Sequence, residues 1–102
     1  MDSRPSPADI QATCDVLRAV ASPVRLSVIL ELAEQPRCVH DLVTQVHASQ
    51  PVVSQHLRVL RAMRLVRSER KGREVLYSLS DDHVAHIARD ALRHVQEGPR
   101  EP

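Results

Sequence analysis

Five side chains of types that bind transition metals recur along the C-terminal part of the chain. They are His83, His86, Asp90, His94 and Glu97. At about 100° per residue, these positions fall within roughly 80° of one another on a helical wheel, so a helix would present them as one stripe. His83 and His94 are separated by about 16 Å along such a helix, whereas metal–ligand bonds are near 2 Å. A single helix therefore cannot close a site around one ion with both histidines.

An apolar stripe runs beside these ligands and gives the helix a face that requires a partner. It consists of Val84, Ile87, Ala88, Ala91, Leu92 and Val95. If two such helices pack antiparallel about a two-fold axis, Asp81 and His83 of one copy meet His94 and Glu97 of the other. Two imidazoles and two carboxylates suit Zn(II), and also Ni(II) or Co(II) with added ligands. The spacing predicts a homodimer with two such sites; the alternative is a dimer helix flanked by ordinary polar residues.

The positive charge of the chain is concentrated in one segment. Residues 58–73 contain seven basic residues and one acid, a local net charge of +6 within a chain whose formal net charge is +1. Such an asymmetry is typical of a surface that binds phosphates. A nucleic-acid-binding face is therefore expected there.

Two cysteines, Cys14 and Cys38, are the only thiols of the 102-residue chain. The polar, proline-containing start and the short apolar runs indicate neither a signal peptide nor a membrane span, so a cytoplasmic location is expected. In that compartment the cysteines are expected to be reduced thiols, metal ligands or small buried side chains, and not a disulfide.

Hydrophobic periodicity predicts five helices within one domain, residues 8–97, between a disordered tail at 1–7 and a flexible tail at 98–102. The expected helices are Ala8–Val20, a segment from Pro23 that ends before Pro36, Val39–Val46, Ser49–Met63, and a last helix capped by Ser80 and Asp81 that runs to Glu97. A short helix, a turn at residues 47–49 and a longer polar-faced helix form a helix-turn-helix.

Between the last two helices the period changes to that of strands. Val66–Arg70 and Glu74–Leu79 are predicted to form a hairpin around Lys71-Gly72-Arg73. Because two strands alone are weakly stable, Val75, Tyr77 and Leu79 are expected to lean on the helices. The fold expected is mainly α with a small β-hairpin wing, a winged helix-turn-helix of order ααααββα.

Eleven residues are predicted to contact double-stranded DNA. They are Ser49, Gln50, Val52, Ser54, Gln55, His56, Arg58 and Arg61 in the longer helix, and Arg70, Lys71 and Arg73 in the wing. Polar side chains of the helix would read base edges in the major groove, and arginines would hold phosphates.

Several of these segments resemble the ArsR/SmtB family of bacterial metal-sensing repressors. The segments are Ala-Ser-Pro-Val-Arg-Leu at 21–26, Ser-Gln-Pro-Val-Val-Ser-Gln-His-Leu at 49–57, Leu-Arg-Ala-Met-Arg-Leu-Val at 60–66 and the wing from Lys71 to Tyr77. The resemblance implies a homodimer formed by the first and last helices that leaves operator DNA on binding metal. It also implies that Asp81, His83, His94 and Glu97 are the ligands, with His86 outside the set as a spare ligand or a solvated side chain.

A second site known in the family lies beside the reading head and uses several thiols. Here the corresponding segment is Cys38-Val39-His40-Asp41, with Cys14 in the first helix. Because this segment holds one thiol where the family pattern has two, the terminal-helix site is the one expected to work.

The sequence thus predicts a metal-responsive repressor of operator DNA, with nickel, zinc or cobalt as the ion. Two alternatives stay open. One is a winged-helix regulator controlled by thiol oxidation or by a second regulatory protein. The other is a small zinc hydrolase, which a closed four-ligand site disfavours because no position is left for water.

Overall fold

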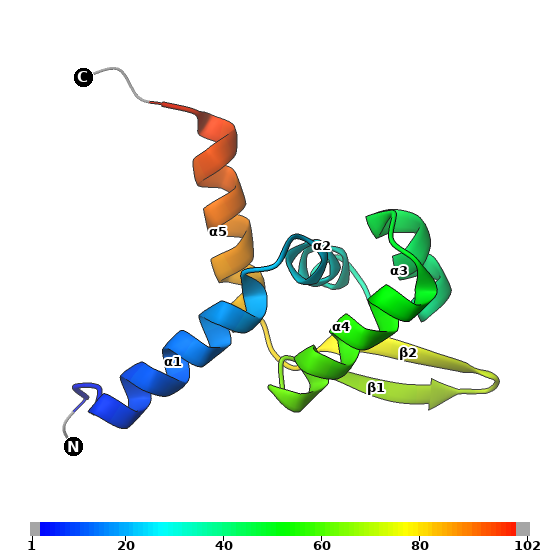
Figure 1. The fold of residues 1–102 in the computed structure, drawn as a ribbon, viewed down its shortest axis with the longest axis horizontal. Helices are drawn as coiled ribbons and strands as arrows, with labels where there is room; N and C mark the ends of the chain where they lie inside the picture. Colours follow the sequence, from blue (N-terminus) through cyan, green and yellow to red (C-terminus); the bar gives the residue numbers. More distant parts are fainter. Residues whose placement is uncertain (1–2, 100–102) are drawn as a thin grey trace.

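The order of elements confirms the predicted winged helix-turn-helix. The computed structural model describes residues 3–99. The elements are α1 (Pro7–Val20), α2 (Pro23–Leu32), α3 (Val39–Val46), α4 (Gln50–Ala62), β1 (Val66–Lys71), β2 (Glu74–Leu79) and α5 (His83–Glu97). β1 and β2 pair antiparallel from Val66↔Leu79 to Lys71↔Glu74 and form the wing (Figure 1).

The first helix begins one residue earlier than its apolar pattern predicts. Ser6 and Asp9 form a reciprocal capping box, in which each backbone N–H donates to the other's side chain at 3.0 Å. Pro7 occupies the first turn, where no intrahelical donor is required. The end of the segment expected to be a tail, residues 1–7, thus belongs to a helix cap; residues 1–2 and 100–102 lie outside the described residues.

The predicted cap of the last helix was wrong. Asp82 occupies the N-cap position of α5, and the Asp81 carboxylate accepts a hydrogen bond from the His83 backbone N–H at 2.9 Å. The Ser80 N–H donates instead to the Leu65 carbonyl at 3.0 Å, which ties the end of the hairpin to the segment before β1. Ser80 therefore closes the wing, while Asp81 stabilises the first turn of α5.

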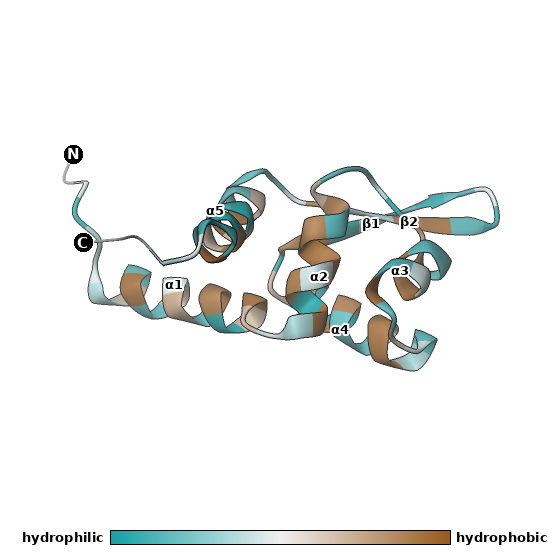
Figure 2. Ribbon diagram, turned by 90° about the horizontal axis from the view of Figure 1, so that it is seen from above, coloured by the Kyte–Doolittle hydropathy of each residue, from teal (hydrophilic) through white to brown (hydrophobic). Residues whose placement is uncertain are grey.

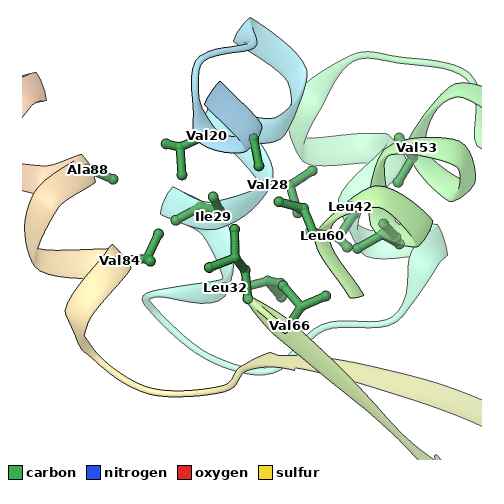
Figure 3. Close-up of a cluster of buried hydrophobic side chains, with 13 residues drawn as sticks. Val20, Val28, Ile29, Leu32, Leu42, Val53, Leu60, Val66, Val84 and Ala88 are labelled. Carbon is green, nitrogen blue, oxygen red and sulfur yellow. The ribbon is translucent and has the colours of Figure 1, made fainter. Parts of the chain in front are cut away.

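α2 lies at the centre of the hydrophobic core (Figure 3). Its Val28 and Ile29 are fully buried, and side chains from every other helix surround them. Tyr77 and Leu79 of β2 pack against this core, as predicted. Tyr77 also exchanges two backbone hydrogen bonds with Arg37, at 2.8 and 3.0 Å, so the hairpin is fixed to the chain before α3.

The molecule is flat, 47 × 41 × 20 Å, with two ends of different character. α1 and α5 project at one end, and α3, α4 and the wing lie at the other, with α2 between them (Figures 1 and 2). Among the described residues, none of the helices combines the length and the apolar character that crossing a bilayer requires.

Candidate nucleic-acid interface and metal ligands

α3 and α4 form the helix-turn-helix. The turn closes at His47, whose left-handed φ of 56° ends α3, and the Ser49 hydroxyl accepts from the Val52 N–H at the start of α4. Leu42 and Leu57 lie fully buried between the helices and α2. The angle at which α4 is presented is thus set by core packing.

The exposed side of α4 carries most of the residues predicted to contact DNA. Gln50, Val52, Gln55, Arg58 and Arg61 are all exposed. A face of amides, an exposed valine and arginines offers both hydrogen-bonding groups for base edges and cations for phosphates. It lies at the end of the molecule that also carries the wing (Figure 1).

The structure places two other predicted contact residues differently. Ser54 and His56 are half-buried, and the His56 Nδ1 lies 3.1 Å from the terminal guanidinium nitrogen Nη1 of Arg25 in α2. His56 follows Val53 by three residues and precedes Leu60 by four, so helical spacing puts it beside the buried face. That spacing was the available signal; Arg25 itself was missed.

The wing presents its basic residues to solvent. Gly72, with a φ of 62°, allows the two-residue turn between Lys71 and Glu74. Arg70, Lys71 and Arg73 around this turn are exposed, and Glu69 pairs with Lys71 at 3.8 Å. An exposed pair of this kind is weak and does not prevent Lys71 from binding phosphate.

We predict that the triple substitution Arg70→Gln, Lys71→Gln and Arg73→Gln lowers the salt dependence of DNA binding. Each phosphate contact contributes about 0.9 to the slope of log K against log [salt], so three lost contacts reduce it by about 2.7. Fluorescence anisotropy at several salt concentrations measures the slope. Arg93→Gln on α5 removes a charge far from the wing and should leave the slope unchanged; an unchanged slope in the triple variant would contradict the wing assignment.

The predicted metal ligands lie along one exposed side of α5. Asp81, His83, His94 and Glu97 are all exposed, and the backbone hydrogen bond of Asp81 keeps its carboxylate beside His83. Within one chain, no group of three or more potential ligands comes together among residues 3–99. This agrees with the distance of about 16 Å expected between the two histidines.

The other polar residues of the stripe have local surroundings. Asp90 pairs with Arg93 at 3.6 Å on the exposed surface of α5. His86, one turn after His83, is exposed and lies outside the four-residue set. Neither is placed at an end of the helix, where the other candidate ligands gather.

Uncovered apolar surface lies next to the ligand stripe. Val84, Ala85 and Ala88 of α5 are buried, but Ile87, Leu92 and Val95 remain 44%, 38% and 73% exposed. α1 at the same end exposes Ile10 and Leu17, and a shallow, mostly apolar hollow there is lined by Cys14, Leu17, Arg18 and Ala21. Apolar residues are visible on both helices in Figure 2. Contiguous exposed apolar surface of this kind marks an interaction site.

The donor set fits a metal shared between two copies. Antiparallel contact of two α5 helices through the exposed apolar residues brings the first turn of one beside the last turn of the other. Each end then supplies one imidazole and one carboxylate, so two ends supply the four donors that a tetrahedral ion requires.

The alternative ligands do not gather in the described chain. Cys38 is the half-buried N-cap residue of α3, and His40 and Asp41 are exposed in its first turn. Cys14 lies on exposed α1, which Figure 1 shows on the other side of α2 from α3. A single chain therefore offers one thiol at α3 and another at a separate end.

Sequence comparison finds relatives over nearly the whole chain. Residues 22–68 match the family described as "Bacterial regulatory protein, arsR family". The chain is 52% identical over 94 residues to the HTH-type transcriptional repressor SmtB of Mycobacterium tuberculosis (strain CDC 1551 / Oshkosh), covering 91% of this chain and 70% of the relative. It is 43% identical over 96 residues to the HTH-type transcriptional regulator NmtR of Mycobacterium tuberculosis, covering 90% and 80%.

Solved structures share the arrangement of helices and wing. The solution structure of apo-NmtR superposes with a TM-score of 0.71 at 36% identity, covering 100% of this chain and 92% of that one. HlyU from Vibrio cholerae superposes with a TM-score of 0.79 at 27% identity, covering 86% and 96%. Both cover the helix-turn-helix together with elements outside residues 22–68.

Proposed function

The chain belongs to the arsR family of bacterial regulatory proteins, and on this premise we propose that it is a homodimeric repressor that leaves operator DNA when α5 binds a divalent transition metal. As a family member it is a DNA-binding transcription regulator and not an enzyme, which rules out the zinc hydrolase. Repression is supported by the relative SmtB, a transcriptional repressor at 52% identity.

The observation that carries the proposal is the composition of α5. Its two ends hold Asp81 with His83 and His94 with Glu97, and exposed apolar residues separate them. The same contact that covers Ile87 in a dimer would complete two sites. Dimer formation and metal binding thus depend on one surface.

The chain's own residues supply a route from this surface to DNA. Val84 and Ala88 of α5 pack against Val20 and Ile29, in α1 and α2 (Figure 3). Arg89 further joins α5 to the end of α2 by donating to the Ala33 carbonyl at 3.0 Å. A change in the angle between two α5 helices therefore moves each α2, and with it each α4 relative to the other. A divalent ion would supply four coordination bonds that fix that angle.

Nitrogen and oxygen donors favour Zn(II), Ni(II) or Co(II) over Cu(I), which prefers sulfur ligands. A relative of more distant sequence is a cadmium resistance transcriptional regulatory protein of Staphylococcus aureus, 28% identical over 96 residues. It supports a response to divalent metals as a class. Because a DNA-binding regulator acts on DNA, we place the protein in the cytoplasm.

The competing controls have less support. Cys14 and Cys38 lie on separate elements, α1 and the start of α3, so a disulfide within one chain would require a rearrangement of the core. A second regulatory protein is supported by no feature of residues 3–99.

The test measures DNA affinity with and without metal. A duplex selected from a random pool by the metal-free protein is titrated by fluorescence anisotropy, with Zn(II), Ni(II), Co(II) or, as a control, Mg(II). We expect one transition metal to weaken binding at least about tenfold, a coupling of about 1.4 kcal/mol, and Mg(II) to have no effect. Equal affinity in the presence of every ion would refute metal control, and a chain that selects no duplex would refute operator binding.

A further inference from the structure

One side chain of α2 links the end of α1 to the reading helix α4. Arg25, the third residue of α2, donates from Nε to the carbonyl of Ala19 in the last turn of α1. Its Nη1 lies 3.1 Å from the His56 Nδ1 on α4, and the contact is partly buried. The α2 backbone is fixed beneath it, because the Arg25 N–H donates to the capping hydroxyl of Ser22.

The chemistry of this contact determines the state of His56. A guanidinium is always charged and offers only donors, so the His56 Nδ1 must accept the hydrogen bond. The ring is therefore neutral, with its proton on Nε2. The charge of Arg25 is favoured by the carbonyl end of α1.

α4 is otherwise held mainly by apolar contacts. Val53, Leu57 and Leu60 are buried in the core. Apolar contacts are not directional and tolerate small rotations of a helix about its axis, whereas a hydrogen bond between a charged fork and a ring nitrogen does not. The contact between Arg25 and His56 is 31 positions long in sequence and thus specifies tertiary geometry.

We propose that Arg25 is a positioning residue for DNA recognition: it fixes the rotation of α4 through His56 and ties that rotation to the last turn of α1. The inference rests on the family's DNA-binding function and on α4 as the reading helix. Arg25 acts through His56 and contacts no phosphate. His56 orients the exposed Gln50 and Gln55 and does not itself read a base.

The first test compares four variants in specific-duplex binding by anisotropy. Arg25→Met and His56→Leu should each weaken binding by about 10–100-fold, because each breaks a hydrogen bond to a charged group. The double variant should be no weaker than either single one, since one interaction is lost in all three. His56→Asn, whose amide oxygen can replace Nδ1 as acceptor, should recover most of the affinity that His56→Leu loses.

The salt dependence separates positioning from direct phosphate contact. Arg25→Met should keep the slope of log K against log [salt], whereas loss of a phosphate contact lowers it by about 0.9. Arg93→Met on α5 is the matched control and should change neither affinity nor slope. Thermal unfolding of each variant shows which are folded at the binding temperature.

A measurement on the unmodified protein needs no variant to fold. Long-range nitrogen–proton NMR correlation of His56 should show an unprotonated Nδ1 and a protonated Nε2. Additive effects in the double variant, a reduced salt slope for Arg25→Met, or a protonated Nδ1 would each overturn the proposal. Failure of the proposed function is distinguished from all of these because the unmodified protein would then bind no duplex specifically.

Discussion

His94→Ala should abolish the response of DNA binding to metal while leaving the affinity of the metal-free protein unchanged. His94 lies in the last turns of α5, at the end of the molecule opposite the wing and α4 (Figure 1). In a two-fold dimer the substitution removes one of four donors from both sites at once. Loss of a ligand should exceed the roughly 10–100-fold loss of metal affinity typical of residues that only support a ligand.

The measurement is anisotropy of the selected duplex over a metal titration, together with calorimetric metal binding. His86→Ala is the matched control, because it removes an exposed imidazole from the same helix but outside the four-residue set. We expect the control to respond as the unmodified protein does. A His94→Ala variant that still releases DNA at the same metal concentration would exclude the α5 site.

The segments with the strongest local signals could be predicted from the sequence nearly residue by residue. α3 has the predicted bounds because Val39, Leu42, Val43 and Val46 recur at helical spacing and His47 ends the helix in a left-handed conformation. The wing differs only in that β1 includes Lys71. In both cases the information lies within a few neighbouring residues.

Where tertiary contacts choose between local options, the sequence pattern was insufficient. Ser80 and Asp81 are both good capping residues, and the hydrogen bond of Ser80 to Leu65 decides that the helix starts later. Arg25 lies among the apolar residues of α2, but its partner His56 is brought to it only by folding. For the metal ligands, even the folded chain is half of the expected site, because the other half belongs to a second copy.

The exposed face of α5 gives the last prediction: Ile87→Glu should convert the protein to a monomer and weaken binding to the selected duplex by at least about 100-fold. Ile87 is 44% exposed in the single chain and lies on the helix that carries both halves of the metal set. Because a two-fold interface repeats every residue, one substitution places two carboxylates in an apolar contact, and each unpaired buried charge costs several kcal/mol.

Loss of the dimer should reduce DNA affinity because two linked reading heads bind two half-sites with a high effective concentration, which a monomer lacks. Sedimentation velocity measures the oligomeric state, and anisotropy measures the affinity. Gln96→Glu adds the same charge to an exposed position of α5, away from the apolar stripe, and should remain dimeric. If Ile87→Glu stays dimeric, α5 is not the interface, and the two halves of the metal set have no partner to meet. If it becomes monomeric and also loses metal binding, one surface of α5 serves both assembly and sensing.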